Sequence, residues 1–537
     1  MSIALAALPV AQLVQQLLID TGVSWLRMLT ALFLSFVLAL LVGIWAARSD
    51  SAGKIILPII DVFQTLPILA FFPLVILVFV AFLPAYIGIN TAIVFLIITS
   101  MLWNMIFAVY EGVKTIPNEM IEVSELYRLS RFQRLRKIYI PAAMPRLVEQ
   151  SMLSWAIGLF YLVTSEIFST GNQVYSATHG IGVAFAQLAQ PPINASYYLI
   201  GFIIFISFVI ATRYLLFASL EKRYIKRTEA QKSGRTAKYR FRGALLFREI
   251  QSLYHGSLGI KPRRHLKRHL TGQPAAVHLA RKEAPRWRKY AYCLIIIAAL
   301  VSILYESGYI NPTTMSDESL VLAALAASFA RVWLVFFAIL AVSIPICVYL
   351  IFMSKKIREY ITVFQILASI PATIVLPLIA YAFVGNPNHG EIVAFVIFFL
   401  SGIWYVIFGA IASSRNLPEE LPEVKGIFHV KGLNAWRKIY ARAIIPGLVT
   451  GAVTGIAAEW NASIVAEYFT NAGVSGSTVV SSVGTGIGKL LDVSVTSTPP
   501  DLLLMVIALI NLTVMIILIN TFVWKRFYRK VADEYRI

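Results

Sequence analysis

Residues 103–123 read WNMIFAVYEGVKTIPNEMIEV, and residues 404–424 read WYVIFGAIASSRNLPEELPEV. The two stretches share a tryptophan, a phenylalanine, a proline and two glutamates at one constant offset, the offset that separates Trp103 from Trp404. The same offset relates Glu166 to Glu467, so apolar and charged positions repeat together. Shared composition does not produce such an ungapped match. The chain therefore contains two copies of one unit, and membrane proteins built in this way usually work where the copies meet.

Composition places the chain in a lipid bilayer. It is 58% hydrophobic and 14% charged over 537 residues, with a mean hydropathy of +0.75. Apolar runs such as 29–47, 91–109 and 502–524 can each cross about 30 Å of hydrocarbon at about 1.5 Å per helical residue. They lack the apolar–polar alternation of membrane barrels. We predict an all-α polytopic membrane protein with about eleven transmembrane helices in two parallel repeats.

The spans divide the chain into a first half (1–220), a basic linker (221–289) and a second half (290–537). Residues 3–19 stand where the second copy has an extra leading span, but they are short and rich in glutamine. We do not expect them to cross the bilayer on their own, and they lack the basic residues that open a signal peptide. The predicted spans are 23–47, 55–83, 91–111, 147–169, 196–220, 290–305, 321–352, 360–384, 392–412, 447–470 and 500–524.

Lysine and arginine predict the orientation. Segments 1–20, 170–195 and 306–320 contain neither residue, whereas 112–146 and 221–289 are rich in both. Basic loops stay in the cytoplasm. We therefore expect a multi-pass protein of the plasma (inner) membrane with its N-terminus outside and its C-terminus in the cytoplasm, which an odd number of spans requires.

The net charge of +20 comes mostly from the linker. A nucleic-acid arm and an anionic-lipid site are two interpretations of such a charge run. We favour a solvated cytoplasmic connector that touches membrane lipid in passing, and we expect no nucleic-acid partner. Cys293 and Cys347 have neither disulfide nor metal-ligand spacing, so no metal site is expected.

The most specific motif lies in one basic loop of each copy. Residues 122–145 read EVSELYRLSRFQRLRKIYIPAAMP, and residues 423–446 read EVKGIFHVKGLNAWRKIYARAIIP. Each follows a proline, shows helical apolar spacing and closes at a proline. We predict a short amphipathic helix, a turn and a second short helix, a surface suited to a groove on a soluble partner. An ordinary basic loop is the alternative, and the match between the copies argues against it.

The spacing Glu–x15–Ile–x2–Pro–x3–Pro resembles the EAA loop of permease subunits of type I ABC importers. Residues 155–168 (WAIGLFYLVTSEIF) and 457–469 (AAEWNASIVAEYF) are similar to the nitrate/sulfonate/taurine/bicarbonate branch. The resemblance covers both halves and is greatest to the duplicated, single-chain permeases of that group. The glycine usual inside the motif is Arg128 in one copy and His429 in the other, and the first closing proline is Arg442 in the second copy.

The resemblance implies the permease component of an ATP-driven importer, which is not itself an enzyme. Two copies of a separate ABC ATPase subunit would bind ATP and Mg²⁺ and dock on the two loops, so this chain would need no cofactor of its own. An external solute-binding protein would deliver a small anion such as nitrate, a sulfonate or bicarbonate. The residues implied at the ATPase contact are Glu122, Leu126, Arg131 and Leu135 in the first loop and Glu423, Ile427, Gly432 and Trp436 in the second.

Polar residues inside the membrane are costly and are therefore candidates for function. An acidic pair facing an anion would repel it, so we expect Glu166 and Glu467 to be structural, bonded to backbone amides or to an arginine such as Arg27 or Arg331. The residues that we predict to line the substrate pathway are Gln64, Asn104, Gln365, Ser369 and Asn461.

Two other classes of protein remain alternatives. A secondary transporter with internal repeats, driven by an ion gradient, would want a buried carboxylate relay and would not need two matched cytoplasmic loops. A membrane scaffold or receptor would not need mid-membrane polar residues in both copies.

Overall fold

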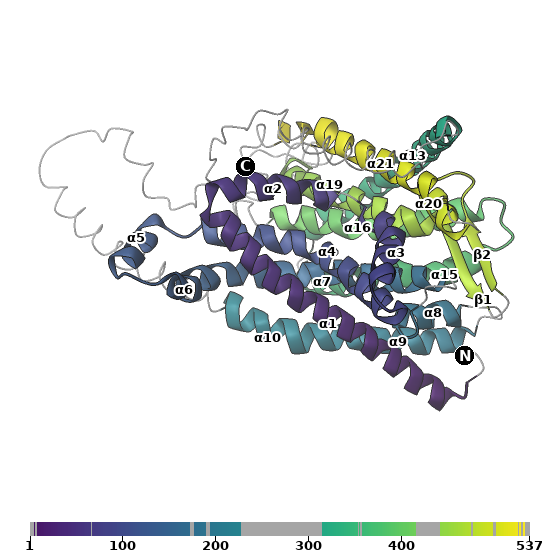
Figure 1. Ribbon diagram of the computed structural model, residues 1–537, viewed down its shortest axis with the longest axis horizontal. Helices are drawn as coiled ribbons and strands as arrows, with labels where there is room; N and C mark the ends of the chain where they lie inside the picture. Colours follow the sequence, from purple (N-terminus) through teal and green to yellow (C-terminus); the bar gives the residue numbers. More distant parts are fainter. Residues whose placement is uncertain are drawn as a thin grey trace, which may run out of the picture.

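The computed structural model describes residues 5, 8–65, 67–171, 177–189, 194–226, 314–352, 354, 357–414, 441–473, 476–497, 501–524, 526–527 and 530–531. Within these ranges it contains 8 helices that are long and apolar enough to cross a membrane, together with one two-stranded sheet. The predicted class of polytopic helical membrane protein is therefore confirmed (Figure 1).

The first half consists of a long helix, a broken helix and three further membrane-length helices. In chain order its elements are α1 (Val10–Arg48), α2 (Asp50–Thr65), η2 (Ile68–Phe71), α3 (Phe72–Phe82), α4 (Ala85–Lys114), α5 (Asn118–Leu126), α6 (Arg131–Arg134), η3 (Leu135–Tyr139), α7 (Ile140–Gly171), α8 (Ile181–Leu188), α9 (Ala195–Thr212), η4 (Arg213–Phe217), α10 (Ala218–Leu220) and η5 (Glu221–Lys226).

The second half repeats this order, and its described part includes a β-hairpin. Its described elements are α13 (Thr314–Phe352), α14 (Ile357–Ala368), α15 (Ala372–Ala382), α16 (His389–Ser414), α19 (Ala441–Ala466), β1 (Tyr468–Gly473), β2 (Gly476–Ser482), α20 (Ile487–Thr496), α21 (Leu502–Ile519) and η8 (Asn520–Trp524). Helices α1 and α13 both contain 39 residues, and α4, α7, α8 and α9 correspond to α16, α19, α20 and α21. The repeat seen in the sequence is thus a repeat of structure.

Two predicted spans are wrong as continuous helices. Residues 55–83 are divided into α2, η2 and α3, and residues 360–384 into α14 and α15. Pro67 precedes η2 and Pro371 precedes α15, both in extended backbone. Proline lacks the N–H that continues a helix and disfavours helical backbone in the residue before it. The remaining predicted span without a counterpart, 290–305, lies outside the described residues.

The prediction for the N-terminal segment is also corrected. Residues 10–22 form the beginning of α1 and are continuous with the first predicted span. At about 1.5 Å per residue the 39-residue helix is about 58 Å long, well beyond the ~30 Å hydrocarbon thickness. The glutamine-rich segment therefore extends a span.

Each half is organised around three helices that pack closely. In the second half α16 and α19 approach through glycines: a Cβ on Gly451 would lie 2.4 Å from the backbone oxygen of Tyr405, and one on Gly409 would lie 2.4 Å from that of Gly447. The equivalent first-half helices, α4 and α7, meet where a Cβ on Gly112 would lie 2.9 Å from the Cα of Ala143. Small residues let membrane helices pack by van der Waals contact, which is the role expected for the Gly447–Gly451–Gly455 stripe.

The halves join through reciprocal contacts of the broken helices. Segment η2 of the first half packs on α19, while α15 of the second half packs on α7 and α8. The hairpin extends this contact, because β1 lies against α7 and α8. Its strands are antiparallel, with Tyr468 opposite Ser482 and Gly473 opposite Gly476.

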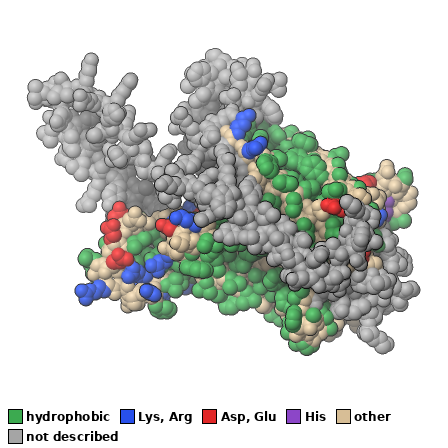
Figure 2. All heavy atoms as spheres, turned by 45° about the horizontal axis from the view of Figure 1, so that its top comes forward, with side chains coloured by type: hydrophobic (Ala, Val, Ile, Leu, Met, Phe, Trp, Pro, Cys, Tyr) green, Lys and Arg blue, Asp and Glu red, His purple; other side chains and the backbone are tan. Residues whose placement is uncertain are grey.

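The two ends of the bundle differ in character. Helices α5 and α6 project at one end, and α8, α20 and the hairpin lie at the other (Figure 1). Described lysine and arginine side chains gather over the end that carries α5 and α6 (Figure 2). We refer to these as the basic end and the hairpin end.

Candidate functional site

A buried carboxylate organises the hairpin end of the first half. Glu166, near the end of α7, is fully buried and accepts hydrogen bonds from Ser24 Oγ at 2.8 and 3.0 Å and from the backbone N–H of Gly182 at 2.8 Å. Arg27 Nη1 also donates to it. Ser24 in turn accepts from the backbone N–H of Ile181 at 2.8 Å. One carboxylate thus joins α1, α7 and the beginning of α8.

The second half repeats this arrangement with the equivalent residues. Glu467, equally buried, accepts from Ser328 Oγ at 2.6 Å, from Arg331 Nη1 at 3.2 Å and from the backbone N–H of Gly488 at 2.8 Å. The N–H of Ile487 donates to Ser328 Oγ at 2.9 Å. We call the two arrangements the outer nodes. Their contacts with backbone amides and with these arginines are those that the sequence analysis anticipated.

The chemistry of the outer nodes follows from their surroundings. The first turn of α8 or α20 has N–H groups without partners inside the helix, and a carboxylate satisfies one of them while complementing the positive end of the helix dipole. A carboxylate without water needs such partners, because burial of an unpaired charge costs several kcal/mol. Gly182 is required by space: a Cβ there would lie 2.7 Å from both the Glu166 Cβ and the backbone oxygen of Val163.

The arginines of the outer nodes also bind different second partners. Arg27 donates through Nε at 3.0 Å and Nη2 at 2.6 Å to Asn90 Oδ1. Arg331 instead makes two 2.6 Å bonds to the carboxylate of Glu391. Sequence reasoning did not single out Ser24, Ser328, Asn90 or Glu391. The repeated pattern Ser-x-x-Arg at 24–27 and 328–331, with Glu166 and Glu467 at a shared offset, was the available signal.

A further carboxyl lies beside the second outer node, outside the membrane-spanning helices. Asp492 of α20 is 6% exposed, and burial raises its pKa to about 7. This carboxyl therefore changes its charge near neutral pH.

The halves touch through polar side chains on the hairpin side of the bundle. Tyr161 of α7 donates to Asn461 Oδ1 of α19 at 2.7 Å, with both residues buried. The hydroxyls of Thr164 and Thr373 lie 3.3 Å apart. Asn461 is five residues before the end of α19, or about 8 Å along the axis. These two contacts, which we call the outer contact, join the halves at this depth.

The other predicted pathway residues lie away from the outer contact. Gln64 of α2 donates to Asn104 Oδ1 of α4 at 2.9 Å, so the structure brings this pair together. Ser369 is half-buried at the break between α14 and α15, and the side chain of Gln365 lies outside the described part of the chain. The pair Gln64–Asn104 is separate from the outer contact, where Asn461 binds Tyr161.

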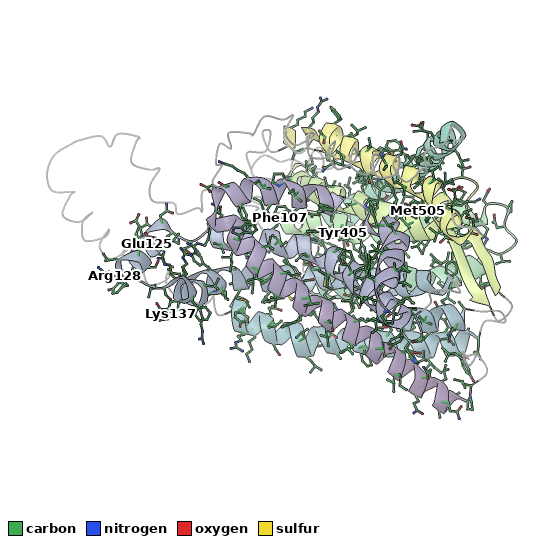
Figure 3. All side chains as sticks on the ribbon, viewed as in Figure 1. Phe107, Glu125, Arg128, Lys137, Tyr405 and Met505 are labelled. Atoms are coloured by element: carbon green, nitrogen blue, oxygen red, sulfur yellow. The ribbon has the colours of Figure 1, made fainter. Side chains whose placement is uncertain are left out.

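An aromatic pair accompanies the polar residues in each half. The rings of Phe63 and Trp103 stack with centroids 5.6 Å apart, and those of Phe364 and Trp404 lie 5.8 Å apart. Figure 3 shows Tyr405, the neighbour of Trp404, in the middle of the bundle. Repeated aromatic faces beside polar groups suit a small solute that has both polar and apolar parts.

Glu459 of α19 breaks the equivalence of the halves. It is fully buried, and neither carboxylate oxygen has a hydrogen-bond partner within the described chain. Its Oε1 would lie 2.6 Å from a Cβ on Gly402. At the equivalent place in the first half the large and small residues are exchanged: Met101 fills the space left by Gly158. The position of Glu459 is Gly158 in the first copy, and the exchange of Met101 for Gly402 makes the space for the larger side chain.

The basic end carries the predicted helix–turn–helix of the first loop. On α5, Glu122 and Leu126 are exposed, and Arg131 is exposed at the start of α6. Arg134 ties the two helices together, donating to Glu125 Oε1 at 2.9 Å and to the backbone oxygen of Leu129 at 3.0 Å. Figure 3 shows Glu125 and Arg128 projecting beyond the bundle.

Two features of this first loop were not expected. Leu135 is half-buried in η3 and faces α1, so its observed contact is within the chain. Arg128, which stands where the resembling family has glycine, adopts a left-handed φ of 49°. The second loop, with Glu423, Ile427, Gly432 and Trp436, lies outside the described residues.

The left-handed residue closes a Schellman turn at the end of α5. The N–H of Arg128 bonds to the oxygen of Glu125 at 2.9 Å, and that of Leu129 bonds to the oxygen of Ser124 at 3.0 Å. Glycine adopts this conformation without the steric cost that a Cβ adds. The left-handed backbone of this turn therefore explains why the resembling family has glycine at the position of Arg128.

Together, the repeated outer nodes and the exposed loop at the opposite end define a helical membrane protein of two equivalent halves. Residues 39–226, just over a third of the chain, match the family described as binding-protein-dependent transport system inner membrane component. The resemblance to type I ABC importer permeases is thereby confirmed for that segment. The second half is related to it by the internal repeat.

Curated relatives are permeases of several solutes. The glycine betaine transport system permease protein OpuAB of Bacillus subtilis is 29% identical over 165 residues, 29% of this chain and 55% of that protein. The glycine betaine/proline betaine permease ProW of Escherichia coli is 32% identical over 155 residues, 29% of this chain and 42% of that protein. The nitrate import permease NrtB of Synechococcus elongatus is 29% identical over 143 residues, 27% of this chain and 46% of that protein. The chain thus spans about half the length of the relatives it matches.

Replacement of Arg128 by glycine is expected to stabilise the turn after α5. The left-handed conformation costs a non-glycine residue about 1 kcal/mol, so hydrogen exchange of the Arg128 and Leu129 amide positions should slow by roughly fivefold. Arg131→Gly is the control, because Arg131 is the first residue of α6, and there glycine should speed local exchange. Faster exchange in Arg128→Gly would contradict this explanation of the motif.

Glu459 and Glu467 should respond oppositely to the same substitution. Glu459→Leu removes an unpartnered buried carboxylate and should raise the free energy of unfolding by about 1–3 kcal/mol. Glu467→Leu, directly after the same helix, removes the acceptor of Ser328 and of the buried Gly488 amide and one of the two carboxylate partners of Arg331, and it should lower this free energy by about 3 kcal/mol. Thermal unfolding of the purified variants in one detergent measures both. A loss of stability in Glu459→Leu would mean that its carboxylate has a stabilising partner.

Proposed function

We propose that the chain is the transmembrane permease of an ATP-driven ABC importer, fused from two halves. The observation that carries the proposal is the family match over residues 39–226 together with the outer node repeated in the second half. The match concerns one half, and the node indicates that the other half has the same construction. We propose the division 1–220, 221–289 and 290–537 on the same basis.

The proposed orientation places the basic end in the cytoplasm and the hairpin end outside. It is supported by the exposed cations on and near α5 and α6, including Arg131, Arg136 and Lys137. The N-terminus is then outside and the C-terminus inside. The exposed loop would receive one copy of an ATPase subunit, and the equivalent loop at 423–446 a second copy. ATP and Mg²⁺ would bind to those subunits, and an external solute-binding protein would meet the hairpin end.

In this mechanism the chain moves between two arrangements of its halves. The outer contact is made in the structure, which corresponds to a pathway closed to the outside. Movement of α5 and α6 would be transmitted through η3 to α7, because α6, η3 and α7 follow one another without a gap. Since α7 carries Tyr161, Thr164 and Glu166, such movement would separate the outer contact while each outer node keeps its own half intact.

The proposed substrate is a small solute with an oxyanion group. Nitrate is one, and glycine betaine, named for two relatives, carries a carboxylate beside a quaternary ammonium. Neutral donors such as Tyr161, Gln64 and Asn104 can bond to an oxyanion without the desolvation cost of a buried cation. The pairs Phe63–Trp103 and Phe364–Trp404 would additionally favour the ammonium of a betaine. Binding measured with nitrate and with glycine betaine separates the two substrates.

The first test is capture of the ATPase. The chain purified from its native membrane should bring an ABC ATPase with it, and Glu122→Ala/Glu423→Ala should weaken that capture because both loops lose the glutamate proposed to contact the ATPase. Glu119→Ala/Glu420→Ala is the matched control at neighbouring acidic positions of each loop. A chain that purifies alone and moves solute in liposomes without ATP would reject the importer and support the secondary transporter.

Loss of one hydrogen bond should weaken the outer contact. A Thr164→Cys/Thr373→Cys pair reports closure through its yield of disulfide, and adding Tyr161→Phe should lower that yield by about fivefold, given about 1 kcal/mol for a net hydrogen bond. Tyr197→Phe is the control, because that hydroxyl bonds at 2.9 Å to the Leu8 oxygen within the first half. Equal yields in the two backgrounds would show that Tyr161 does not hold the halves together.

A further inference from the structure

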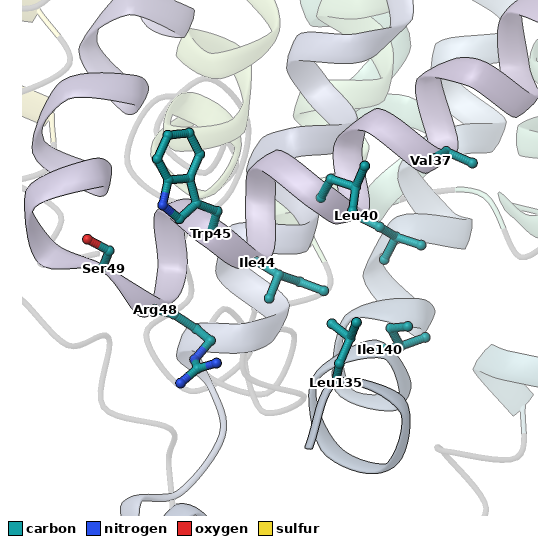
Figure 4. A pocket seen from close by; sticks show the side chains of 9 residues that line it. Val37, Leu40, Ile44, Trp45, Arg48, Ser49, Leu135 and Ile140 are labelled. Atoms are coloured by element: carbon teal, nitrogen blue, oxygen red, sulfur yellow. The ribbon is translucent and has the colours of Figure 1, made fainter. Parts of the chain in front are cut away.

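A groove runs along the outside of α1 at the basic end (Figure 4). Its volume is ≈ 520 Å³, and it lies between α1 and the stretch formed by η3 and the beginning of α7. Its wall on α1 extends from Val37 through Leu40 and Ile44 to Arg48, and Leu135 faces it from η3. The groove is therefore apolar along its length and basic at one end.

Its length matches one leaflet of a bilayer. Val37 and Arg48 are eleven residues apart, which is about 16 Å along a helix, and half of a ~30 Å hydrocarbon core is about 15 Å. Trp45, beside Arg48, is 61% exposed, and tryptophan is enriched where hydrocarbon meets headgroups. An extended acyl chain would fit along the groove with its headgroup beside Trp45 and Arg48.

The headgroup end has unsatisfied positive charge. The Arg48 guanidinium lies 4.8 Å from the ring centroid of Tyr139, which fixes its position, and it forms no ion pair with any residue that the structure describes. Arg136 and Lys137 of η3 are exposed at the same end. Three cations beside an apolar groove are complementary to a lipid that carries a negative phosphate and an acyl chain.

The second half differs at the position equivalent to Arg48. Helix α13 has the same length as α1, and the residue equivalent to Arg48 is Phe352, the last residue of α13. Tyr349 occupies the place of Trp45 and is 54% exposed. At this pair of positions the aromatic residue at the interface is kept and the arginine is not.

We propose that this groove binds one anionic phospholipid of the cytoplasmic leaflet, with its phosphate at Arg48 and an acyl chain against α1. Leu135 and Ile140 form its opposite wall, and they directly follow the first coupling loop. The lipid would therefore occupy the space through which α6 and α7 move relative to α1, and anionic lipid would alter the coupling of the first loop. The inference requires the proposed orientation but no particular transported solute.

The test uses the full chain in nanodiscs of phosphatidylcholine that contain a small fraction of photoactivatable phosphatidylglycerol. Irradiation followed by peptide mapping should place the label on residues 37–49 or 135–140, and excess phosphatidylglycerol but not phosphatidylcholine should compete. Arg48→Gln should reduce labelling there by about fivefold, the effect of one cation near a charged headgroup. The readout does not depend on transport, so it remains informative whatever solute the protein moves.

Two further variants control the measurement. Arg526→Gln removes an exposed arginine that also lies over an aromatic ring, 5.4 Å from the Phe522 centroid, but does not line this groove, and it should leave labelling there unchanged. Leu40→Trp fills the groove and keeps Arg48, and it should also reduce labelling. Equal competition by phosphatidylcholine, or no label in the groove of the wild type, would overturn the proposal. The second result would mean that another part of the chain or a protein partner covers the groove.

Discussion

The structure depends on the pairing of two buried carboxylates with the first amides of two short helices. In an apolar environment an unpaired carboxylate and an unpaired amide are both expensive, and the outer nodes satisfy them together. Glu166 and Glu467 thereby fix α8 and α20 against the ends of α7 and α19. Arg27 and Arg331 extend each node to the next helix, so the hairpin end of each half is bonded as one unit. In the proposed mechanism, this bonding would let each half move as one body.

The two halves share a framework but do not have identical interiors. Met101 and Gly158 in the first half become Gly402 and Glu459 in the second, so the same space is filled from the opposite helix. The outer contact is likewise asymmetric, because Tyr161 and Asn461 are not equivalent positions of the repeat. A single solute crossing between the halves would therefore meet different groups on its two sides. A pair of identical subunits could not present that difference.

The basic end links three functions in one short stretch of chain. Helix α5 offers an exposed surface, Arg134 holds α6 against it, and η3 continues into α7 without a break. Arg128 stabilises the direction of this turn less well than glycine would, which leaves the first loop less rigid than the family pattern implies. The groove beside Leu135 places the surrounding lipid against the same segment. If the proposals for the ATPase and the lipid hold, coupling in this half would respond to both a soluble partner and the membrane.

Sequence alone determined the class, the repeat, the first loop motif and the amide and arginine partners of Glu166 and Glu467, but not their serine partners, because periodicity, charge and spacing are local or repeated properties. It did not determine the breaks at Pro67 and Pro371 or the extension of α1 to Val10, since span length follows from packing against other helices as well as from hydropathy. Nor could it pair Tyr161 with Asn461, or show that Met101 packs against Gly158 while Glu459 packs against Gly402. The residues of each pair are far apart in the sequence, and only the tertiary structure brings them within bonding or packing distance.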